Sequence, residues 1–94
     1  MDVSGNLMRM ARTCKARHKS YGDSPIRHGA MLAALHPSGV RLRTPHEHDV
    51  FALWVALTGK LVRFAVSGFT HQDSIHDAAV YAAMLEGKVQ EGKQ

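Results

Sequence analysis

The feature that most restricts the fold of this chain is a long segment, residues 45–67, in which only Gly59 weakens a helix after the first position. Thr44 can cap its start, Pro45 suits the first helical position, and Glu47 can reach back to complete a capping box. Gly68 is a natural stop. A helix that is apolar nearly all round packs on several sides, so we expect this one to be central. Most of its circumference is covered by Val50, Phe51, Trp54, Val55, Leu57, Leu61, Val62, Phe64 and Val66.

A second helix is expected after a short turn, residues 68–72. Asp73 or Thr70 can cap it, and it runs over residues 73–86 to a stop at Gly87. Because the connection is so short, the two helices should form an antiparallel hairpin. The tail, residues 88–94, is polar, and we expect it to be frayed.

The first half of the chain predicts two further helices. Residues 5–19 place Leu7, Met10, Ala11, Cys14 and His18 along one side. Residues 21–23 form a turn, Ser24-Pro25 starts a helix over residues 25–35, and His36-Pro37 ends it. The sum is one all-α domain, residues 1–94, built as a small bundle of about four helices with a C-terminal antiparallel hairpin.

Length and composition limit what this domain can be. At 94 residues with 45% hydrophobic residues, the chain has room for one small core, so self-association as a homo-oligomer is a fair expectation. The single cysteine, Cys14, excludes an internal disulfide and suits a reducing compartment, where we expect it to be a small core residue. No apolar run approaches the ~18 residues that span a membrane, so a cytoplasmic location is expected.

The charge balance favours an anionic partner. Twelve Lys and Arg against eight Asp and Glu give a formal net charge of +4, which suits nucleotides, phosphate or nucleic acid. Nucleic acid is the less favoured of these, because the cations of the first helix are spread round it and few aromatic residues are available for stacking. Two groups, His46-x-His48-Asp49 and His71-x-Asp73, hold ligand types of transition-metal sites, but both lie where helices start and polar residues are common.

One polar constellation stands out on the two C-terminal helices. Lys60 and Arg63 share the polar stripe of the central helix, and Asp73 and Asp77 lie one turn apart on the last helix, with Tyr81 at their flank. An antiparallel hairpin brings Arg63 close to Asp73 and sets Lys60 level with Asp77.

This constellation has two interpretations. In the first, interhelical salt bridges fix the register of the hairpin while the stripe faces water. In the second, Lys60 and Arg63 hold phosphate oxygens, and Asp73 and Asp77 hold Mg²⁺ together with waters and the ligand's own phosphates. Tyr81 then stacks on a base or bonds a sugar; otherwise it is a core tyrosine. The sequence contains no Gly-rich phosphate loop, nucleophile elbow or strong Ser/His/Asp arrangement, which sets those enzyme classes aside.

The ordered set of polar motifs resembles an uncharacterised family of small phage and prophage helical proteins. That family is in turn distantly similar to the MazG-like all-α nucleotide pyrophosphohydrolases. The resemblance covers roughly residues 14–85, and its C-terminal half is the more specific part. The motifs that carry it are Arg17-x3-Tyr21-Gly22-Asp23, Asp49, Lys60-x2-Arg63 and Asp73-x3-Asp77-x3-Tyr81.

The resemblance implies a phage origin, the host cytoplasm as location, and a link to nucleotide metabolism or nucleotide signals. It adds Arg17 and Tyr21 to Lys60, Arg63 and Tyr81 as expected nucleotide-binding residues. The MazG-like enzymes carry a Glu-x-x-Glu motif facing Glu-x-x-Asp, which together hold Mg²⁺. The central helix here departs from that pattern, since its only acids, Glu47 and Asp49, lie near its start and its later turns carry cations.

Compared with the MazG-like enzymes, this chain has fewer carboxylates and more Lys and Arg side chains at the expected site. Such a site favours binding a phosphate over activating a water molecule with metal ions. We therefore expect first a protein that binds a phosphorylated nucleotide. In a phage, such a protein could sequester a nucleotide signal of the host. The alternatives are an Mg²⁺-dependent MazG-like pyrophosphohydrolase and a non-catalytic adaptor that binds protein or nucleic acid.

Overall fold

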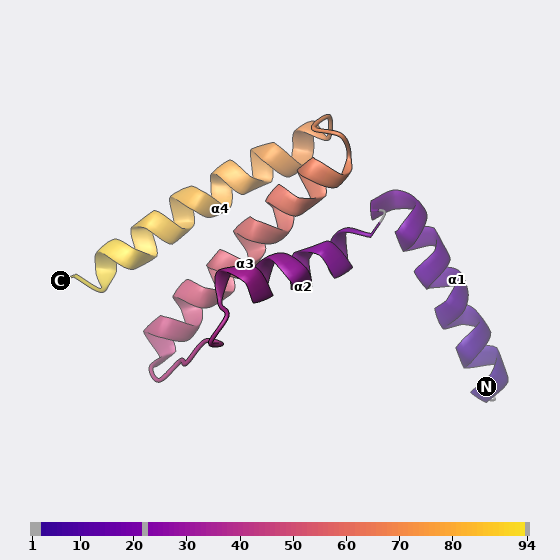
Figure 1. Cartoon of the computed structure of the whole chain (residues 1–94), viewed down its shortest axis with the longest axis horizontal. Helices are drawn as coiled ribbons and strands as arrows, with labels where there is room; N and C mark the ends of the chain where they lie inside the picture. Colours follow the sequence, from indigo (N-terminus) through magenta and orange to yellow (C-terminus); the bar gives the residue numbers. More distant parts are fainter. Residues whose placement is uncertain (1–2, 22, 94) are drawn as a thin grey trace.

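The computed structural model describes residues 3–21 and 23–93, and for residues 13–21 it describes the backbone alone. Four α-helices make up this part of the chain: α1 (Val3–Tyr21), α2 (Ser24–Leu35), α3 (Pro45–Val66) and α4 (Gln72–Glu91). No strand occurs among the described residues, so the predicted all-α class is confirmed. α2, α3 and α4 pack together, whereas α1 extends away from them (Figure 1).

The start of α3 follows the sequence prediction. The Thr44 hydroxyl accepts a hydrogen bond from the Glu47 backbone N–H at 3.1 Å, and Pro45 occupies the first turn. Capping of this kind satisfies one of the donors that a helix leaves unpaired at its N-terminus. α3 then continues through Gly59 without interruption, as expected.

The end of α3 is a left-handed turn that reverses the chain. Gly68 has φ +77°, and Phe69 follows with φ +65°. The Phe69 N–H donates to the Phe64 carbonyl and the Gly68 N–H to the Ala65 carbonyl, the two bonds of a Schellman motif. The rings of Phe64 and Phe69 meet edge to face at 5.8 Å, the apolar contact that accompanies this motif. The predicted stop at Gly68 is therefore confirmed.

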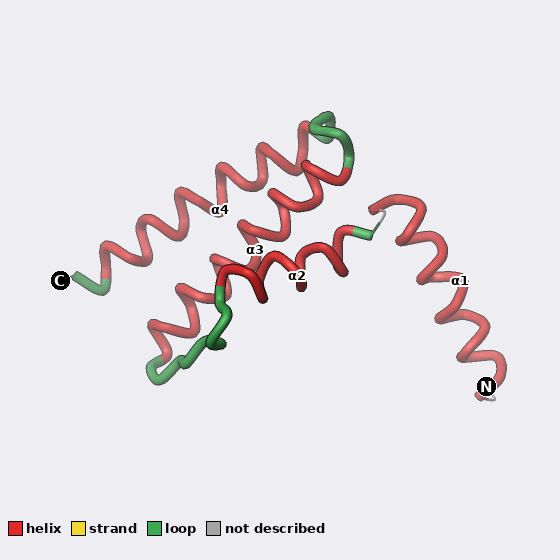
Figure 2. Tube along the Cα trace, in the orientation of Figure 1, coloured by secondary structure: helices red, strands yellow, loops and turns green. Residues whose placement is uncertain are grey.

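α4 runs back along α3 as its antiparallel neighbour (Figure 2). The side chains that α4 brings to this contact are small: Ser74 is fully buried, and Ala78 is nearly so. Small residues let two helix axes approach closely, which lengthens the contact along both helices. The predicted hairpin and the central position of α3, with α2 and α4 on different sides, are confirmed.

Two histidines join α2 to α3. His28 Nε2 donates to the Thr58 hydroxyl at 2.8 Å, while that hydroxyl donates to the Trp54 carbonyl at 2.9 Å. His36 Nδ1 bonds the Leu32 carbonyl at 2.8 Å, and its Nε2 accepts from Trp54 Nε1 at 3.3 Å. A neutral ring with its proton on Nδ1 satisfies both His36 contacts together. These bonds fix α2 along α3 although the interface holds little apolar burial.

Three boundary predictions were wrong. α2 includes Ser24, which is buried in its first turn, and the cap residue is Asp23. The cap of α4 is His71 rather than Asp73 or Thr70, and its ring contacts the Ser74 hydroxyl. α4 also passes through Gly87 to Glu91, so most of the predicted frayed tail is helical. Glycine only weakens a helix, and the contacts of α4 with α3 outweigh that preference.

Gly87→Ala should stabilise the protein by roughly 0.5–1 kcal/mol, because Gly87 lies inside α4 and alanine loses less backbone entropy on folding. A Cβ at this position meets nothing within 4 Å. Gly59→Ala is the matched control: its Cβ would lie 3.1 Å from Cε1 of His28, a ring held by Thr58, so it should gain less or destabilise. Urea unfolding at one protein concentration measures both. If α4 instead ended at Gly87, Gly87→Ala would be the more destabilising of the two substitutions.

Candidate functional site

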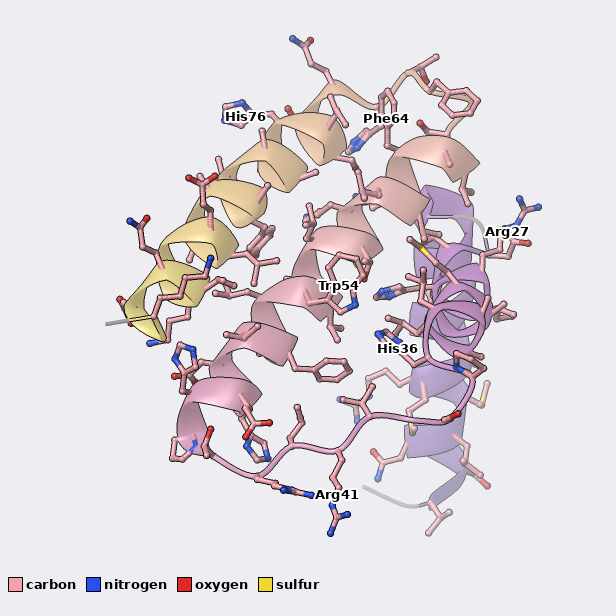
Figure 3. All side chains as sticks on the ribbon, turned by 60° about the vertical axis from the view of Figure 1, so that its left-hand side comes forward. Arg27, His36, Arg41, Trp54, Phe64 and His76 are labelled. Atoms are coloured by element: carbon pink, nitrogen blue, oxygen red, sulfur yellow. The ribbon has the colours of Figure 1, made fainter. Side chains whose placement is uncertain are left out.

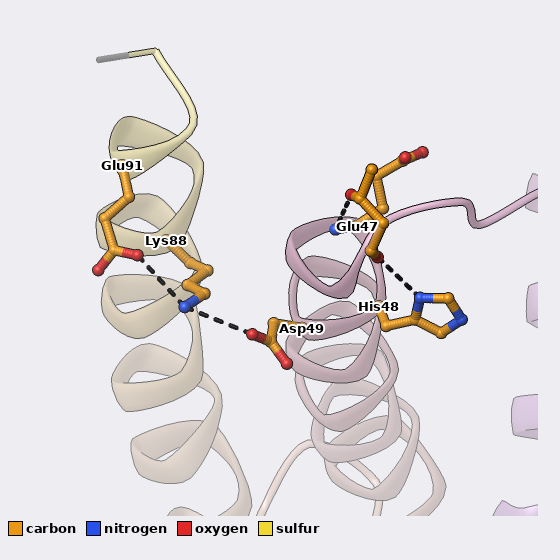
Figure 4. Close-up of polar contacts among 6 residues, drawn as sticks. Glu47, His48, Asp49, Lys88 and Glu91 are labelled. Atoms are coloured by element: carbon orange, nitrogen blue, oxygen red, sulfur yellow. Dashed lines mark hydrogen bonds and ion pairs between the residues drawn. The ribbon is translucent and has the colours of Figure 1, made fainter.

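A row of charged side chains follows one seam between α3 and α4. Lys60 Nζ lies 3.1 Å from Asp77 Oδ2, and Lys88 Nζ lies 3.4 Å from Asp49 Oδ2. Lys88 also reaches Glu91 Oε2 on its own helix at 3.2 Å, so it sits between two carboxylates (Figure 4). The prediction that Lys60 and Asp77 lie opposite each other across the hairpin is confirmed.

The two interhelical pairs agree on one register. The step from Asp49 to Lys60 along α3 covers as many residues as the step from Asp77 to Lys88 along α4. An antiparallel contact with this register therefore runs unbroken from one pair to the other. At the far end, a Cβ on Gly92 would collide with the ring of His46, which shows how closely the helix ends approach.

This register places the other predicted site residues. Tyr81, which is half-buried on α4, lies level with Ala56 of α3, between the two ion pairs. Arg63, also half-buried, lies level with Ser74, one residue from Asp73. Asp73 is exposed in the first turn of α4. The hairpin thus gathers Lys60, Arg63, Asp77 and Tyr81 near one seam.

Two predicted residues stay untested by these contacts. Arg17 and Tyr21 lie in α1, within the stretch whose side chains fall outside the described residues, as does Cys14. Their expected roles therefore remain predictions. Asp49, by contrast, is placed by its ion pair with Lys88, a partner that the prediction of a frayed tail had concealed. The helical spacing from Asp77 to Lys88 is the signal that reveals it, since both residues fall on one face of α4.

Two neighbouring carboxylates change the pKa of Lys88. The hydrogen bond and charge of Glu91 raise the pKa of Lys88 above its ordinary value of 10.5, and Asp49 raises it further. Because its ammonium form is favoured by folding, its contribution to stability is full below the unfolded pKa and is lost as pH rises through the folded pKa. At neutral pH the contribution is complete.

The predicted Mg²⁺ ligands fit a metal poorly. The Lys60 ammonium already contacts one oxygen of Asp77, and a divalent cation there would meet this positive charge. Across the described residues, no group of three or more His, Cys, Asp and Glu side chains is arranged to hold a metal ion. The arrangement instead presents two cations to an anionic ligand, with Asp77 orienting one of them.

A second feature, missed by the sequence interpretation, lies on another face of α3. An apolar pocket of about 480 Å³ opens beside Trp54. Figure 3 shows Trp54 in the space between α4 and α2, with His36 opposite. The nearly all-round apolar surface of α3 was interpreted as core, but a chain of this length has too few helices to cover every side. The lining residues are Leu42, His46, Glu47, Val50, Phe51, Trp54, Val89, Gly92 and Lys93.

Comparison with known protein families, with characterised proteins and with solved structures found no match to this chain. No helix among the described residues is both long enough and apolar enough to cross a membrane.

The Lys60–Asp77 pair should contribute little to stability. The two side chains are 26% and 44% exposed, and pairs of this kind are worth about 0.2–1 kcal/mol. A double-mutant cycle of Lys60→Ala and Asp77→Ala, followed by urea unfolding, measures the coupling. The cycle of Lys60→Ala with Asp73→Ala is the control and should show less. Equal coupling in both cycles would contradict the register.

Glu91→Gln should lower the pKa of Lys88 more than Asp49→Asn does, because Glu91 is the larger cause of its rise. A pH titration of the lysine side-chain NMR signals measures both shifts. Lys60 serves as the internal reference, since neither carboxylate contacts it in the described part of the chain. A pKa of Lys88 that does not respond to Asp49→Asn would mean that the end of α4 is not held on α3.

Proposed function

We propose that this protein binds a phosphorylated nucleotide at the α3–α4 seam. The observation that carries the proposal is the position of Lys60 and Arg63, which lie one turn apart on α3, with the half-buried Tyr81 one turn along the seam from Lys60. Two cations at this spacing suit two oxygens of one phosphate or of neighbouring phosphates. The net charge of +4 favours the approach of such a ligand.

In this proposal Asp77 has a positioning role. Its contact at 3.1 Å holds the Lys60 ammonium in a defined place before the ligand arrives. A phosphate offers two negative charges near neutral pH, so it competes well for this ammonium. Tyr81 supplies an aromatic face or a hydroxyl one turn further along the seam, where a base or sugar attached to that phosphate can reach it.

The small number of carboxylates near Lys60 and Arg63 supports binding without catalysis. The MazG-like alternative needs several carboxylates around Mg²⁺, and here Asp77 is engaged by Lys60 while Asp73 is exposed. For a phage-encoded protein in the host cytoplasm, such binding amounts to sequestering a nucleotide signal.

A second candidate function is supported by a different observation. The pocket beside Trp54 is lined mainly by apolar side chains, and grooves of this kind accept the apolar face of a helix. A non-catalytic adaptor that binds a helix would use this surface and leave the α3–α4 seam as a structural set of ion pairs.

Lys60→Ala and Arg63→Ala should each weaken nucleotide binding at least about tenfold, since each removes a charged hydrogen-bond donor. Thermal-shift assays with a panel of linear and cyclic nucleotides, with and without Mg²⁺, identify the ligand, and calorimetry then measures affinity. Arg41→Ala is the control, because it removes the same charge from an exposed position in the loop before α3.

The outcomes separate the candidates. Affinity that falls equally in all three variants would show a general charge effect and contradict the site. No response to any nucleotide would leave the adaptor as the better account. Release of pyrophosphate that EDTA abolishes would instead support the Mg²⁺-dependent hydrolase.

A further inference from the structure

The described fold exposes far more surface than a compact protein of its size. Its accessible surface is 7162 Å², whereas a folded monomer of 10.3 kDa is expected to expose about 5,400 Å². The radius of gyration is 16.5 Å against about 12 Å expected for this length. Each chain therefore carries an excess of about 1,800 Å², as the difference between these areas shows.

Much of this excess lies on α1. Within its described half, Val3, Leu7, Met8 and Met10 are each more than half exposed. Figure 2 shows that α1 projects from the other helices along its whole length. A single helix of this length is marginal in water, and its stability normally comes from packing an apolar face. Val3, Leu7 and Met10 share one such face, which has no extensive contact within the described chain.

A matching apolar surface is available on the three-helix body. The pocket beside Trp54 opens between α4 and the segment that joins α2 to α3. Toward the other end of the hairpin, Leu61 on α3 and Ile75 on α4 are both exposed, and Val89 is exposed beside the pocket. By helical spacing these residues fall on the side of α3 and α4 that is turned away from Lys60 and Asp77. We call this surface, defined by Val50, Trp54, Leu61, Ile75 and Val89, the apolar groove.

The charges near the two surfaces add a smaller preference. α1 contains five Lys and Arg and no acid. Of the four acids of α4, Glu86 falls on the groove side by helical spacing, whereas the other three fall on the side of Lys60. Glu47 and Lys93 both line the pocket. The basic α1 therefore meets two acids and one lysine at the groove, a balance that favours their encounter.

The short link between α1 and α2 favours an exchange between two chains. α1 ends at Tyr21 and α2 begins at Ser24, so two residues alone separate them. Short connections that hold an element away from its own chain promote swapping, and a two-fold arrangement lets each copy both give and receive the element. Covering about 1,800 Å² on each chain also matches the 2,000–5,000 Å² total of obligate homodimers.

We propose that two copies of this chain form an exchanged dimer in which α1 of each copy lies in the apolar groove of the other. This dimer does not depend on nucleotide binding, because the groove and the α3–α4 seam use different faces of the hairpin. It assigns a role to α1 and accounts for the small number of buried apolar residues in one chain, among which the described part holds Val62 and Ala78.

A matched pair of variants in α1 tests the proposed face. Met10→Glu should raise the dimer dissociation constant at least about tenfold, because it puts a charge into the groove. Met8→Glu makes the same change at a similar exposure, 59% against 63%, but on another side of the helix, and should have little effect. Sedimentation over a range of concentrations measures the constant, and the wild type should have twice the mass of 10.3 kDa.

A second pair tests the groove. Ile75→Glu should weaken the dimer, whereas Val80→Glu, at a similar exposure on the other side of α4, should not. To show that α1 crosses between chains, a Met10→Cys chain is mixed with an Ile75→Cys chain, both in a Cys14→Ser background, and disulfides are scored by mass. Disulfides should join the two different chains.

Several outcomes would overturn the proposal. A wild type that stays monomeric at all concentrations would mean that α1 folds back on its own chain or stays free. Equal weakening by Met8→Glu and Met10→Glu would show that no single face of α1 is buried. A dimer in which the two cysteine chains fail to cross-link would place another surface at the interface.

Discussion

The close contact between α3 and α4 is the constraint on which the rest of the structure depends. Fully buried Ser74, with Ala78 one turn further on, lets the first turns of α4 approach α3 closely. Their small volumes also mean that this contact buries little apolar surface. Ion pairs near both ends of the seam, Lys60–Asp77 and Asp49–Lys88, then agree on a single register. Packing brings the helices together, and charge selects the alignment.

This alignment divides the hairpin into two faces with different chemistry. One face carries Lys60, Arg63 and Asp77, whose charges suit a phosphorylated ligand. The other carries the apolar groove around Trp54, whose surface suits a helix. Because both faces are built on the same two rods, a ligand on one face and a helix on the other can be bound at the same time.

α2 is attached to this hairpin by hydrogen bonds more than by apolar burial. His28 and His36 each bond a residue of α3, and the His36 ring also meets the rings of Phe51 and Trp54 edge to face. Within residues 23–93, a body held this way leaves nine large apolar side chains exposed. A partner that covered these side chains would stabilise such a fold, which is the basis of the proposed dimer.

The sequence by itself determined the helical class, the hairpin and both ends of α3. Those features arise from short-range chemistry: the Thr44 cap, the Gly68 stop, and apolar residues at helical spacing. The sequence also predicted that Lys60 lies opposite Asp77, because a short turn forces the second helix to run back antiparallel to the first.

Only the tertiary structure decided where α4 ends and which apolar residues are buried. Gly87 is a local stop signal, yet α4 continues to Glu91, where Lys88 bridges Asp49 and Glu91. The apolar surface of Trp54 likewise looked like core, but no helix of the described chain covers that side. In both cases the deciding contacts join residues far apart in sequence, and no local pattern contains the energy of such contacts.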